Sequence, residues 1–482
     1  MSSGPSDAHI ELSRSQSDPP TFTPGEASFR DPQSGVVATD TEVFRFFRGK
    51  ARADFEALSS AGLIDELVRR RLIPPVTQPD GASLSQLDLI FPSDSLVVTQ
   101  PTLPFISYPY EWPFGMLQAA ALLHLELLEF SLSRGATLKD ASPYNIQFTG
   151  TDPCFIDLGS FERYVEGTPW GAYTQFCNLF LHPLVLEAFV SVPFQPWLRS
   201  SLEGIPAGFL SQTLPLRAKI RPGIFTNVLL QGFLQGRVGS ATPAELGVKP
   251  VVPKQALLGH LRKLRDLVSG LKPPTRATEW SGYAEVNSYS AEARERKAAF
   301  VEGALVRLRP HTVWDLGCNS GDYAMLASKH APTVIAMDSD PTLIDSLYSR
   351  ARSSSAGVLA LVMDLNNPSP DQGWDQRERT GLTGRGPADL VLALALVHHV
   401  RLRGNVPVRH FVRWLERIAR HCVVEFVPKT DPAARRLLAW RDDVYDDYDE
   451  GQFEAALSER FVIDEKYRLP DSDRVLFSGR VR

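Results

Sequence analysis

The fold is decided by TVWDLGCNSGDYA, residues 312–324, in which a short apolar strand runs into a polar turn. Asp315 stands near the end of the predicted strand, and Gly317 and Gly321 let the backbone of the turn approach a ligand closely. A helix is predicted to begin directly after the turn. A strand, a glycine turn and a helix in this order are typical of a nucleotide-binding element, and the rest of the chain decides whether one is present.

The apolar runs that follow repeat an acid at the strand end. The runs are TVIAMD (333–338), VLALVMD (358–364), ADLVLALAL (388–396) and HCVVEFVP (421–428). The first two end in Asp338 and Asp364. Apolar runs that alternate with helix-length segments predict a parallel sheet covered on both faces, whose carboxyl ends share one ligand-binding edge. FVIDEKYRL and DRVLFSGR then predict a closing hairpin at the edge of the sheet.

From about residue 280 to the C-terminus, these features resemble the class I S-adenosylmethionine (SAM)-dependent methyltransferases. Asp315, Gly317 and Gly321 match the family's acid-x-Gly-x-Gly-x-Gly motif, and Asn319 stands where the middle glycine is commonest. The resemblance implies an α/β fold, with a Rossmann-like seven-stranded sheet whose last strand is reversed. A Rossmann-like domain without a cofactor is the alternative. A dinucleotide-dependent dehydrogenase would show G-x-G-x-x-G after its first strand.

The resemblance also implies a role for each polar strand end. Asp315 and Gly317 would hold the methionine part of SAM, and Asp338 would bind the ribose hydroxyls. Asp364 and the backbone of Leu365 would bind adenine. The remaining implied cofactor contacts are Asn319, Gly321, Ser339 and Ala395. SAM is therefore the predicted cofactor, and no metal site is predicted.

His398 and His399 follow the fourth apolar run, where family members place residues that face the acceptor. Methyl transfer from a sulfonium is an in-line displacement, and a base helps when the acceptor is a hydroxyl or a protonated amine. Because histidine titrates near neutral pH, the pair is the predicted catalytic site, with packing of the loop as the alternative. Glu425 is an orienting partner or a structural acid. Tyr283 and Tyr289 are candidates to cover the cofactor, with core packing as the equal alternative.

No motif identifies the acceptor. The Asn/Asp-Pro-Pro-aromatic motif of base-amino methyltransferases is missing after the fourth run, and so is the paired-glutamate loop of arginine methyltransferases. A hydroxyl of a small molecule or glycan is the acceptor class we favour.

A second polar group lies in LKDASPYNIQFTGTDPCFIDLGSFE, residues 138–162. Asp140, Asn145 and Asp157 resemble the catalytic and metal-binding loops of the protein-kinase-like fold, in which they would serve as the base and as magnesium ligands on ATP. No glycine-rich loop precedes them, and Arg45 is the candidate for the phosphate-binding cation. An active kinase, a degenerate module that binds a ligand or partner, and a coincidence in a helical scaffold all stay open.

SYPYEW, LKDASPYNIQF and TPWGAYTQFCNLFLHP are similar to the N-terminal half of bacterial two-part methyltransferases, some of them associated with nodulation and cell-surface glycans. Four segments are predicted. They are a disordered tail at 1–27, a mostly helical α+β kinase-like domain at 28–238, a linker with a basic helix at 239–275, and the methyltransferase domain at 276–482.

The composition predicts a globular, cytoplasmic protein. Of 482 residues 43% are apolar and 22% charged, and the net charge of −5 makes nucleic acid an improbable main partner. The four cysteines form no CxxC pair, and no signal peptide is evident. The most apolar predicted helix, which begins at Met116, contains Gln118, His124, Glu126 and Glu129. A membrane span would not tolerate that many polar groups.

Several functions remain to be compared. The first is a methyltransferase whose N-terminal module positions the acceptor. The second is a bifunctional enzyme that also binds magnesium-ATP through Asp157. The third is a non-catalytic binding protein in which both modules are remnants. A nucleic-acid methyltransferase is the weakest, because the basic helix HLRKLRDLV (260–268) also fits an exposed linker helix. The oligomeric state is not predicted.

Overall fold

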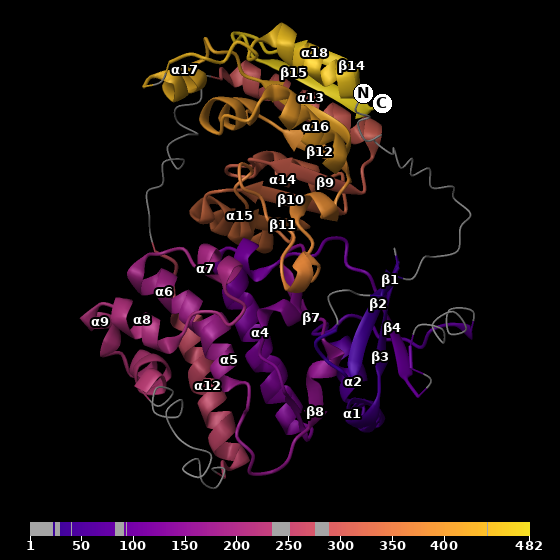
Figure 1. Cartoon of the computed structure of the whole chain (residues 1–482), viewed down its shortest axis with the longest axis vertical. Coiled ribbons are helices and arrows are strands. Elements are labelled where there is room, and N and C mark those ends of the chain that lie inside the picture. Colours follow the sequence, from indigo (N-terminus) through magenta and orange to yellow (C-terminus); the bar gives the residue numbers. More distant parts are fainter. Residues whose placement is uncertain are drawn as a thin grey trace, which may run out of the picture. The chain divides into compact units, whose positions relative to one another are not determined.

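The structure is a computed structural model, and part of the chain is described in it. The described residues are 23–24, 29–39, 41–81, 91–92, 94–233, 251–274, 289–440 and 442–482. They form two compact units, one within Met1–Ala53 and Pro75–Thr102, the other within Asp54–Pro74 and Leu103–Arg482 (Figure 1). The predicted disordered tail, except residues 23–24, lies outside the described residues, as do residues 239–250 of the predicted linker.

The first unit is built on a four-stranded antiparallel sheet in the order β1-β2-β3-β4. Its strands are β1 (Thr23–Pro24), β2 (Ser34–Ala38), β3 (Glu42–Phe47) and β4 (Leu96–Pro101). α1 (Gly49–Ser60) begins in this unit and continues past its boundary at Ala53, and α2 (Leu63–Arg69) belongs to the second unit. Val37, Phe44, Phe91 and Val97 form a small core against this sheet. Because side chains alternate between the two faces of a strand, every second residue is enough to build such a core.

In the second unit, the N-terminal half is organised around α4 (Phe114–Ser133). Two antiparallel strand pairs follow α4, β5 (Ala136–Leu138) with β8 (Phe161–Arg163) and β6 (Ile146–Thr149) with β7 (Asp152–Phe155). The helices after them are α5 (Tyr173–Phe176), α6 (His182–Val190), α7 (Gln195–Ser200), α8 (Ala207–Thr213), α9 (Leu216–Lys219), α10 (Pro222–Ile224) and α12 (Lys254–Gly270). The α+β character predicted for this half is therefore observed.

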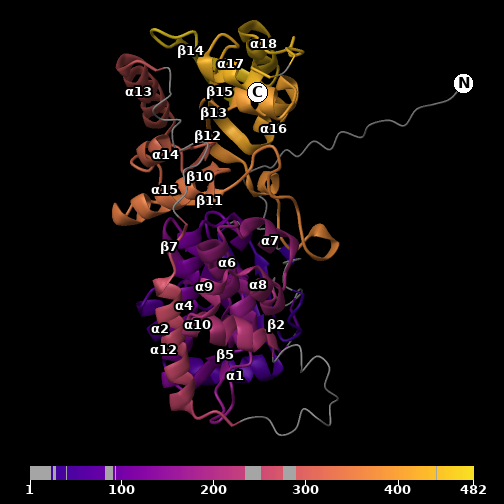
Figure 2. The same cartoon turned by 90° about the vertical axis from the view of Figure 1, so that its left-hand side faces the viewer.

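In the part of the chain that the structure describes, α4 is the one helix long and apolar enough to cross a membrane. However, 67% of that apolar window is buried inside the fold, as in the central helix of a packed domain. α12 lies beside α4 (Figure 2) and turns Leu257, Leu261 and Leu264 inward. Arg262 and Arg265 of α12 pair with Glu129 of α4, so the basic helix has a structural role.

The C-terminal half is built on a seven-stranded sheet in the order β11-β10-β9-β12-β13-β15-β14. Its strands are β9 (Thr312–Leu316), β10 (Thr333–Asp338), β11 (Val358–Val362), β12 (Ala388–Ala393), β13 (Ala419–Phe426), β14 (Phe461–Arg468) and β15 (Val475–Val481). The first five strands are parallel, and β15 runs antiparallel to both β13 and β14. This order confirms the predicted sheet with its reversed last strand.

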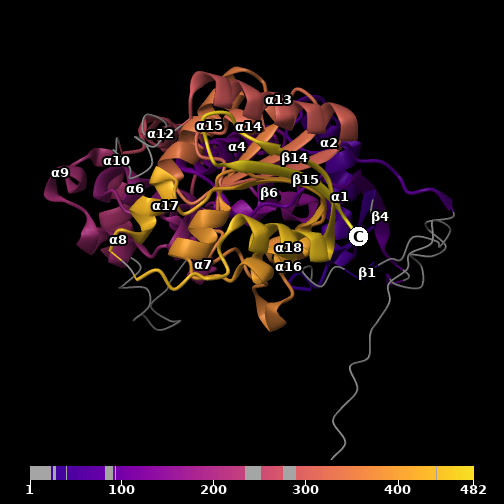
Figure 3. The ribbon, with the colours of Figure 1, turned by 90° about the horizontal axis from the view of Figure 1, so that it is seen from above.

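Helices cover both faces of this sheet, which explains why its strands are almost continuously apolar. Figure 3 shows α13 (Ala291–Leu308), α14 (Asp322–Ala327) and α15 (Pro341–Ser353) on one face, and α16 (Val408–Ile418) and α18 (Glu450–Arg460) on the other. α17 (Pro432–Leu438) follows β13.

Candidate functional site

A cavity of about 1010 Å³ lies at the carboxyl ends of β9, β10 and β12. The strand order places β9 between β10 and β12, so the chain changes direction across the sheet at this point. Open α/β sheets bind their ligands at such a switch point. The other walls of the cavity come from α13, α14 and the π-helical turn η8 (His399–Arg403).

The turn after β9 holds a tight backbone conformation. Gly317 and Gly321 have φ of +69° and +77°, and Asn319 has φ of +50°. Asparagine adopts this left-handed conformation more readily than most residues, which explains how Asn319 replaces the usual glycine. A Cβ at Gly321 would lie 2.5 Å from the Leu347 side chain. Gly321 therefore serves the packing of α14 on α15, and unlike the other predicted cofactor residues it does not line the cavity.

Asp315 lines the cavity although its side chain is almost fully buried. Its Oδ2 atom has no hydrogen-bond partner within the described residues. Burial raises the pKa of Asp315 to about 7, with Lys297 opposing and Asp338 reinforcing the shift. An isolated buried carboxylate oxygen is costly, so a donor from a bound ligand would relieve it. This is the observation by which the residues present fit the ammonium group of a SAM-like cofactor.

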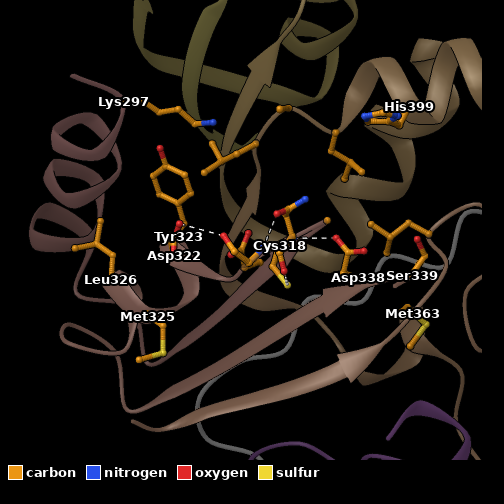
Figure 4. A pocket seen from close by; sticks show the side chains of 18 of the residues that line it. Lys297, Cys318, Asp322, Tyr323, Met325, Leu326, Asp338, Ser339, Met363 and His399 are labelled. Carbon is orange, nitrogen blue, oxygen red and sulfur yellow. Dashed lines mark hydrogen bonds between the residues drawn. The ribbon is translucent and has the colours of Figure 1, made fainter. Parts of the chain in front are cut away.

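Asp338 and Ser339 face the same cavity from the end of β10 (Figure 4). Asp338 accepts hydrogen bonds from the backbone N–H groups of Asn319, at 2.9 Å, and Asp340, at 3.0 Å. Burial raises the pKa of Asp338, and these two hydrogen bonds oppose the shift. The carboxylate is thus fixed at the cavity edge by its own backbone.

Residues that follow the third and fourth strands, β11 and β12, complete the floor of the cavity. Asp364 and Leu365 line the cavity after β11, and Ala395 lines it after β12 with φ of +49°. Asp364 Oδ1 accepts a 2.9 Å hydrogen bond from the backbone N–H of Asn366. Every predicted cofactor residue except Gly321 is thus brought to one cavity.

The two predicted catalytic histidines differ in their access to the cavity. His399 lines the cavity, whereas His398 is completely buried behind it, with its ring 4.0 Å from that of His399. Burial, reinforced by Arg403 and Arg474, lowers the pKa of His399 to about 4. Burial also lowers the pKa of His398 well below its ordinary value. Both rings are therefore neutral at pH 7, and only His399 is placed to meet an acceptor.

Glu425, predicted as an orienting partner or a structural acid, lies in a buried charge cluster beside the cavity, whose members Lys297 and Arg474 were not predicted. Lys297 Nζ lies 2.7 Å from Glu425 Oε2, and Arg474 Nη1 lies 3.4 Å from Glu425 Oε1. The Tyr289 hydroxyl is hydrogen-bonded to Glu425, and Lys297 lies over the rings of Tyr289 and Tyr323. Burial alone would raise the pKa of Glu425, but Lys297 and Arg474 outweigh it and the pKa is lowered. Glu425 is thus a buried anion that fixes two cations.

One sequence signal for this cluster was available. Lys297 lies on the apolar face of α13 with Ala293, Phe300 and Val301, a position that a solvated lysine would avoid. Tyr289 lines the cavity and its hydroxyl is hydrogen-bonded to Glu425, so its role in covering the cofactor stays a prediction. Tyr283 lies outside the described residues.

The N-terminal polar residues also come together, around the hydroxyl of Ser160. Ser160 Oγ lies 2.8 Å from Asp157 Oδ2 and 3.4 Å from Asp140 Oδ2, and Asn145 Nδ2 donates to it at 3.2 Å. Asp157 Oδ1 also accepts from the backbone N–H of Gly159 at 3.1 Å. No group of three or more His, Cys, Asp or Glu side chains suited to a metal ion occurs among the residues described. Arg45 lies on β3, in the first unit.

Comparison with known proteins identifies the family. No protein-family model matches the chain. The nodulation protein NoeA of Rhizobium meliloti (strain 1021) is 37% identical over 457 residues, which cover 94% of this chain and 94% of that protein. This chain belongs to the NoeA family. The match covers nearly all of both chains and therefore includes both halves of the second unit.

Two solved structures are similar to part of this NoeA-family chain. The N-methyltransferase NodS from Bradyrhizobium japonicum WM9 has 14% identity and a TM-score of 0.29, covering 40% of this chain and 98% of NodS. Magnesium protoporphyrin IX methyltransferase ChlM from Synechocystis PCC 6803 has 15% identity and a TM-score of 0.31, covering 43% of this chain and 90% of ChlM.

The strand order and the site of this NoeA-family chain define its C-terminal half. The sheet has the order and the reversed last strand expected for class I methyltransferases. A glycine turn follows its first strand, and acids from three successive strand ends meet in one cavity. The C-terminal half therefore has the fold of the class I SAM-dependent methyltransferases.

Proposed function

We propose that the chain transfers a methyl group from SAM to a hydroxyl of a small molecule or glycan in the cytoplasm. The observation that carries the proposal is the meeting of Asp315, Asp338 and Asp364 in one cavity at the switch point of the sheet. Bound SAM would supply a methyl group made electrophilic by its sulfonium. The protein's own contribution is to bind the cofactor and the acceptor, to orient them and to exclude water.

Each acid suits a different part of such a cofactor. The unpartnered Oδ2 of Asp315 would accept a hydrogen bond from the ammonium group of the methionine part. Asp338, already held by two backbone N–H groups, has a fixed carboxylate for the two ribose hydroxyls. Asp364 would accept from the exocyclic amine of adenine. The three carboxylates stand in chain order along one edge of the sheet, as an extended nucleoside ligand requires.

His399 is the residue we assign to the acceptor. A neutral imidazole on the cavity wall can accept a hydrogen bond from a hydroxyl and take its proton as the carbon–oxygen bond forms. With a pKa of about 4 it is a weak base, so it orients the hydroxyl before transfer and takes the proton late.

Replacing this histidine tests that assignment. We expect His399→Ala to lower kcat for methyl transfer by about 10²-fold or more, the usual size of a general-base contribution. His410→Ala, at an exposed position on α16, is the matched control. Equal rates for His399→Ala and the control would remove His399 from the mechanism.

The proposal as a whole is tested by calorimetric titration with SAM and S-adenosylhomocysteine. We expect a dissociation constant near the micromolar range, about 8 kcal/mol, and loss of binding in Asp338→Ala. Asp446→Ala, an exposed acid away from the cavity, should bind as the unaltered protein does. Failure of a demonstrably folded protein to bind either ligand would contradict the proposal.

The N-terminal cluster supports a second candidate function. We infer that magnesium-ATP would bind there if the module is kinase-like, because Asp140, Asn145 and Asp157 all approach the Ser160 hydroxyl. The hairpin of β6 and β7 lies between Asn145 and Asp157, as in the kinase pattern. Binding of magnesium-ATP that disappears in Asp157→Ala would support the bifunctional enzyme. Binding of SAM without transfer to any acceptor would instead favour a non-catalytic binding protein.

A further inference from the structure

One loop forms the part of the cavity that adenine would occupy, and residues of the N-terminal half of the same unit make hydrogen bonds to this loop. This loop, residues 363–387, joins β11 to β12, and Asp364, Leu365 and Asn366 at its start line the cavity. Figure 1 shows the orange segment between β11 and β12 extending to the N-terminal half of the unit. The loop therefore has one end in the cofactor site and its middle on the N-terminal half.

Arg199 of α7 makes the most direct of these contacts. Its guanidinium donates to the backbone carbonyl of Asn367 at 3.1 Å and to that of Pro368 at 2.9 Å. The Gln372 side chain donates in return to the carbonyl of Arg199 at 3.1 Å. Arg199 thus fixes the backbone immediately after the three cavity residues, and a charged donor makes stronger hydrogen bonds than a neutral one.

A second contact comes from Glu111, which is almost completely buried. The Ser369 hydroxyl donates to Glu111 Oε1 at 2.6 Å, and Arg385 Nη1 donates to Glu111 Oε2 at 2.9 Å. The backbone N–H of Ser369 in turn donates to the sulfur of Met363 at 3.4 Å, and Met363 lines the cavity. Ser369 near the start of the loop and Arg385 near its end are therefore both hydrogen-bonded to the Glu111 carboxylate, which lies outside the seven-stranded sheet.

The held loop also touches the turn that carries His399. A Cβ at Gly404, which ends η8, would lie 2.0 Å from Asn366 Oδ1, so the loop and the turn are packed without space for a side chain. A shift of the loop would therefore be felt at the acceptor side of the cavity as well as under adenine.

We infer that Arg199 is a positioning residue of the cofactor site: through Asn367 and Pro368 it sets the place of Asp364, and the N-terminal half is thereby part of the adenine subsite. This inference rests on the proposed function, since it concerns the same cavity. Arg199 touches no part of the cavity itself and acts only through the loop.

The test compares S-adenosylhomocysteine with S-inosylhomocysteine, in which an oxo group replaces the exocyclic amine that Asp364 would accept from. The unaltered protein should prefer the adenosyl ligand. Arg199→Ala should raise the dissociation constant of S-adenosylhomocysteine about tenfold and leave that of S-inosylhomocysteine nearly unchanged, because a displaced carboxylate loses its discrimination. Arg199→Lys should recover part of the preference. Arg217→Ala, on α9 of the same half, is the matched control.

The possible outcomes distinguish failure of the positioning role of Arg199 from failure of the proposed function. Unchanged preference in Arg199→Ala, with circular dichroism showing a folded protein, would overturn the positioning role and leave the proposed function intact. An equal loss for both ligands would also overturn it, because a general structural role predicts no change in discrimination. Failure of the unaltered protein to bind either ligand would overturn the proposed function and this inference together.

Discussion

The two groups of acids in this chain differ in what surrounds their oxygens. In the methyltransferase domain, Asp315 keeps a buried oxygen without a partner in the described structure, at the wall of a large cavity. In the N-terminal half, Asp140 and Asp157 approach the hydroxyl of Ser160, and Asp157 also accepts from the Gly159 backbone. The sequence alone does not distinguish the two groups, because each consists of acids spaced along the chain. A carboxylate that its own chain leaves incomplete is the stronger indication of a ligand.

The largest expected effect tests how firmly the methyltransferase site is built. Glu425→Ala should lower the free energy of unfolding by about 3–5 kcal/mol, because it leaves Lys297 buried without its anion and leaves Arg474 with Asp431 alone. Urea denaturation measures this. The matched control is Glu459→Ala, whose partner Arg409 is 71% exposed, and a loss of less than about 1 kcal/mol is expected there. Similar losses for both would show that the cluster is not the support we describe.

The second effect concerns the incomplete carboxylate itself. Because its pKa is about 7 in the folded protein and 3.8 is the ordinary value, ionising Asp315 opposes folding increasingly as the pH rises from about 4 to 7. Asp315→Asn should therefore stabilise the ligand-free protein at pH 8 by roughly 2–4 kcal/mol, at about 1.4 kcal/mol per pKa unit. The gain should shrink toward pH 4. Urea denaturation at pH 5 and pH 8 checks both points, and a variant that is less stable at both values would contradict them.

A smaller effect is expected in the core of the N-terminal half. His124 is completely buried among Trp170, Phe176 and Phe180, and neither ring nitrogen has a hydrogen-bond partner in the residues described. Burial lowers its pKa to about 3, so the folded protein loses stability as the pH falls from about 6.5 toward 3.

His124→Phe removes that loss. We expect it to stabilise the protein by about 1–2 kcal/mol at pH 7, because an unsatisfied buried polar group is removed, and by more at pH 5. Thermal or urea unfolding at the two pH values measures the change. Destabilisation at pH 5 would mean that the larger ring does not fit and that packing outweighs the polar term.

The methyltransferase sheet could be predicted from the sequence because each buried parallel strand is a separate apolar run, and because the acids mark the strand ends. The cluster of Glu425 with Lys297 and Arg474 could not, since the three residues come from distant segments that meet only in the fold. A motif does not show whether a glycine faces a ligand or a helix, and the structure places Gly321 against Leu347, outside the cavity lining.

Other expectations depend on finer geometry or stay predictions. The sequence does not show which of His398 and His399 faces the cavity, because the π-helical turn η8 sets their directions. The kinase-like character of the N-terminal half and the predicted domain boundaries remain predictions. The compact first unit excludes Asp54–Pro74, a segment that the sequence pattern placed with its neighbours.

The most direct test of the comparison between the two groups of acids is a crossed calorimetric titration with S-adenosylhomocysteine. We expect binding at one site that is lost in Asp338→Ala and unchanged in Asp157→Ala, because the nucleoside is assigned to the C-terminal cavity. Binding that survives in Asp338→Ala, or that disappears in a folded Asp157→Ala protein, would contradict the assignment of the cofactor to the methyltransferase cavity.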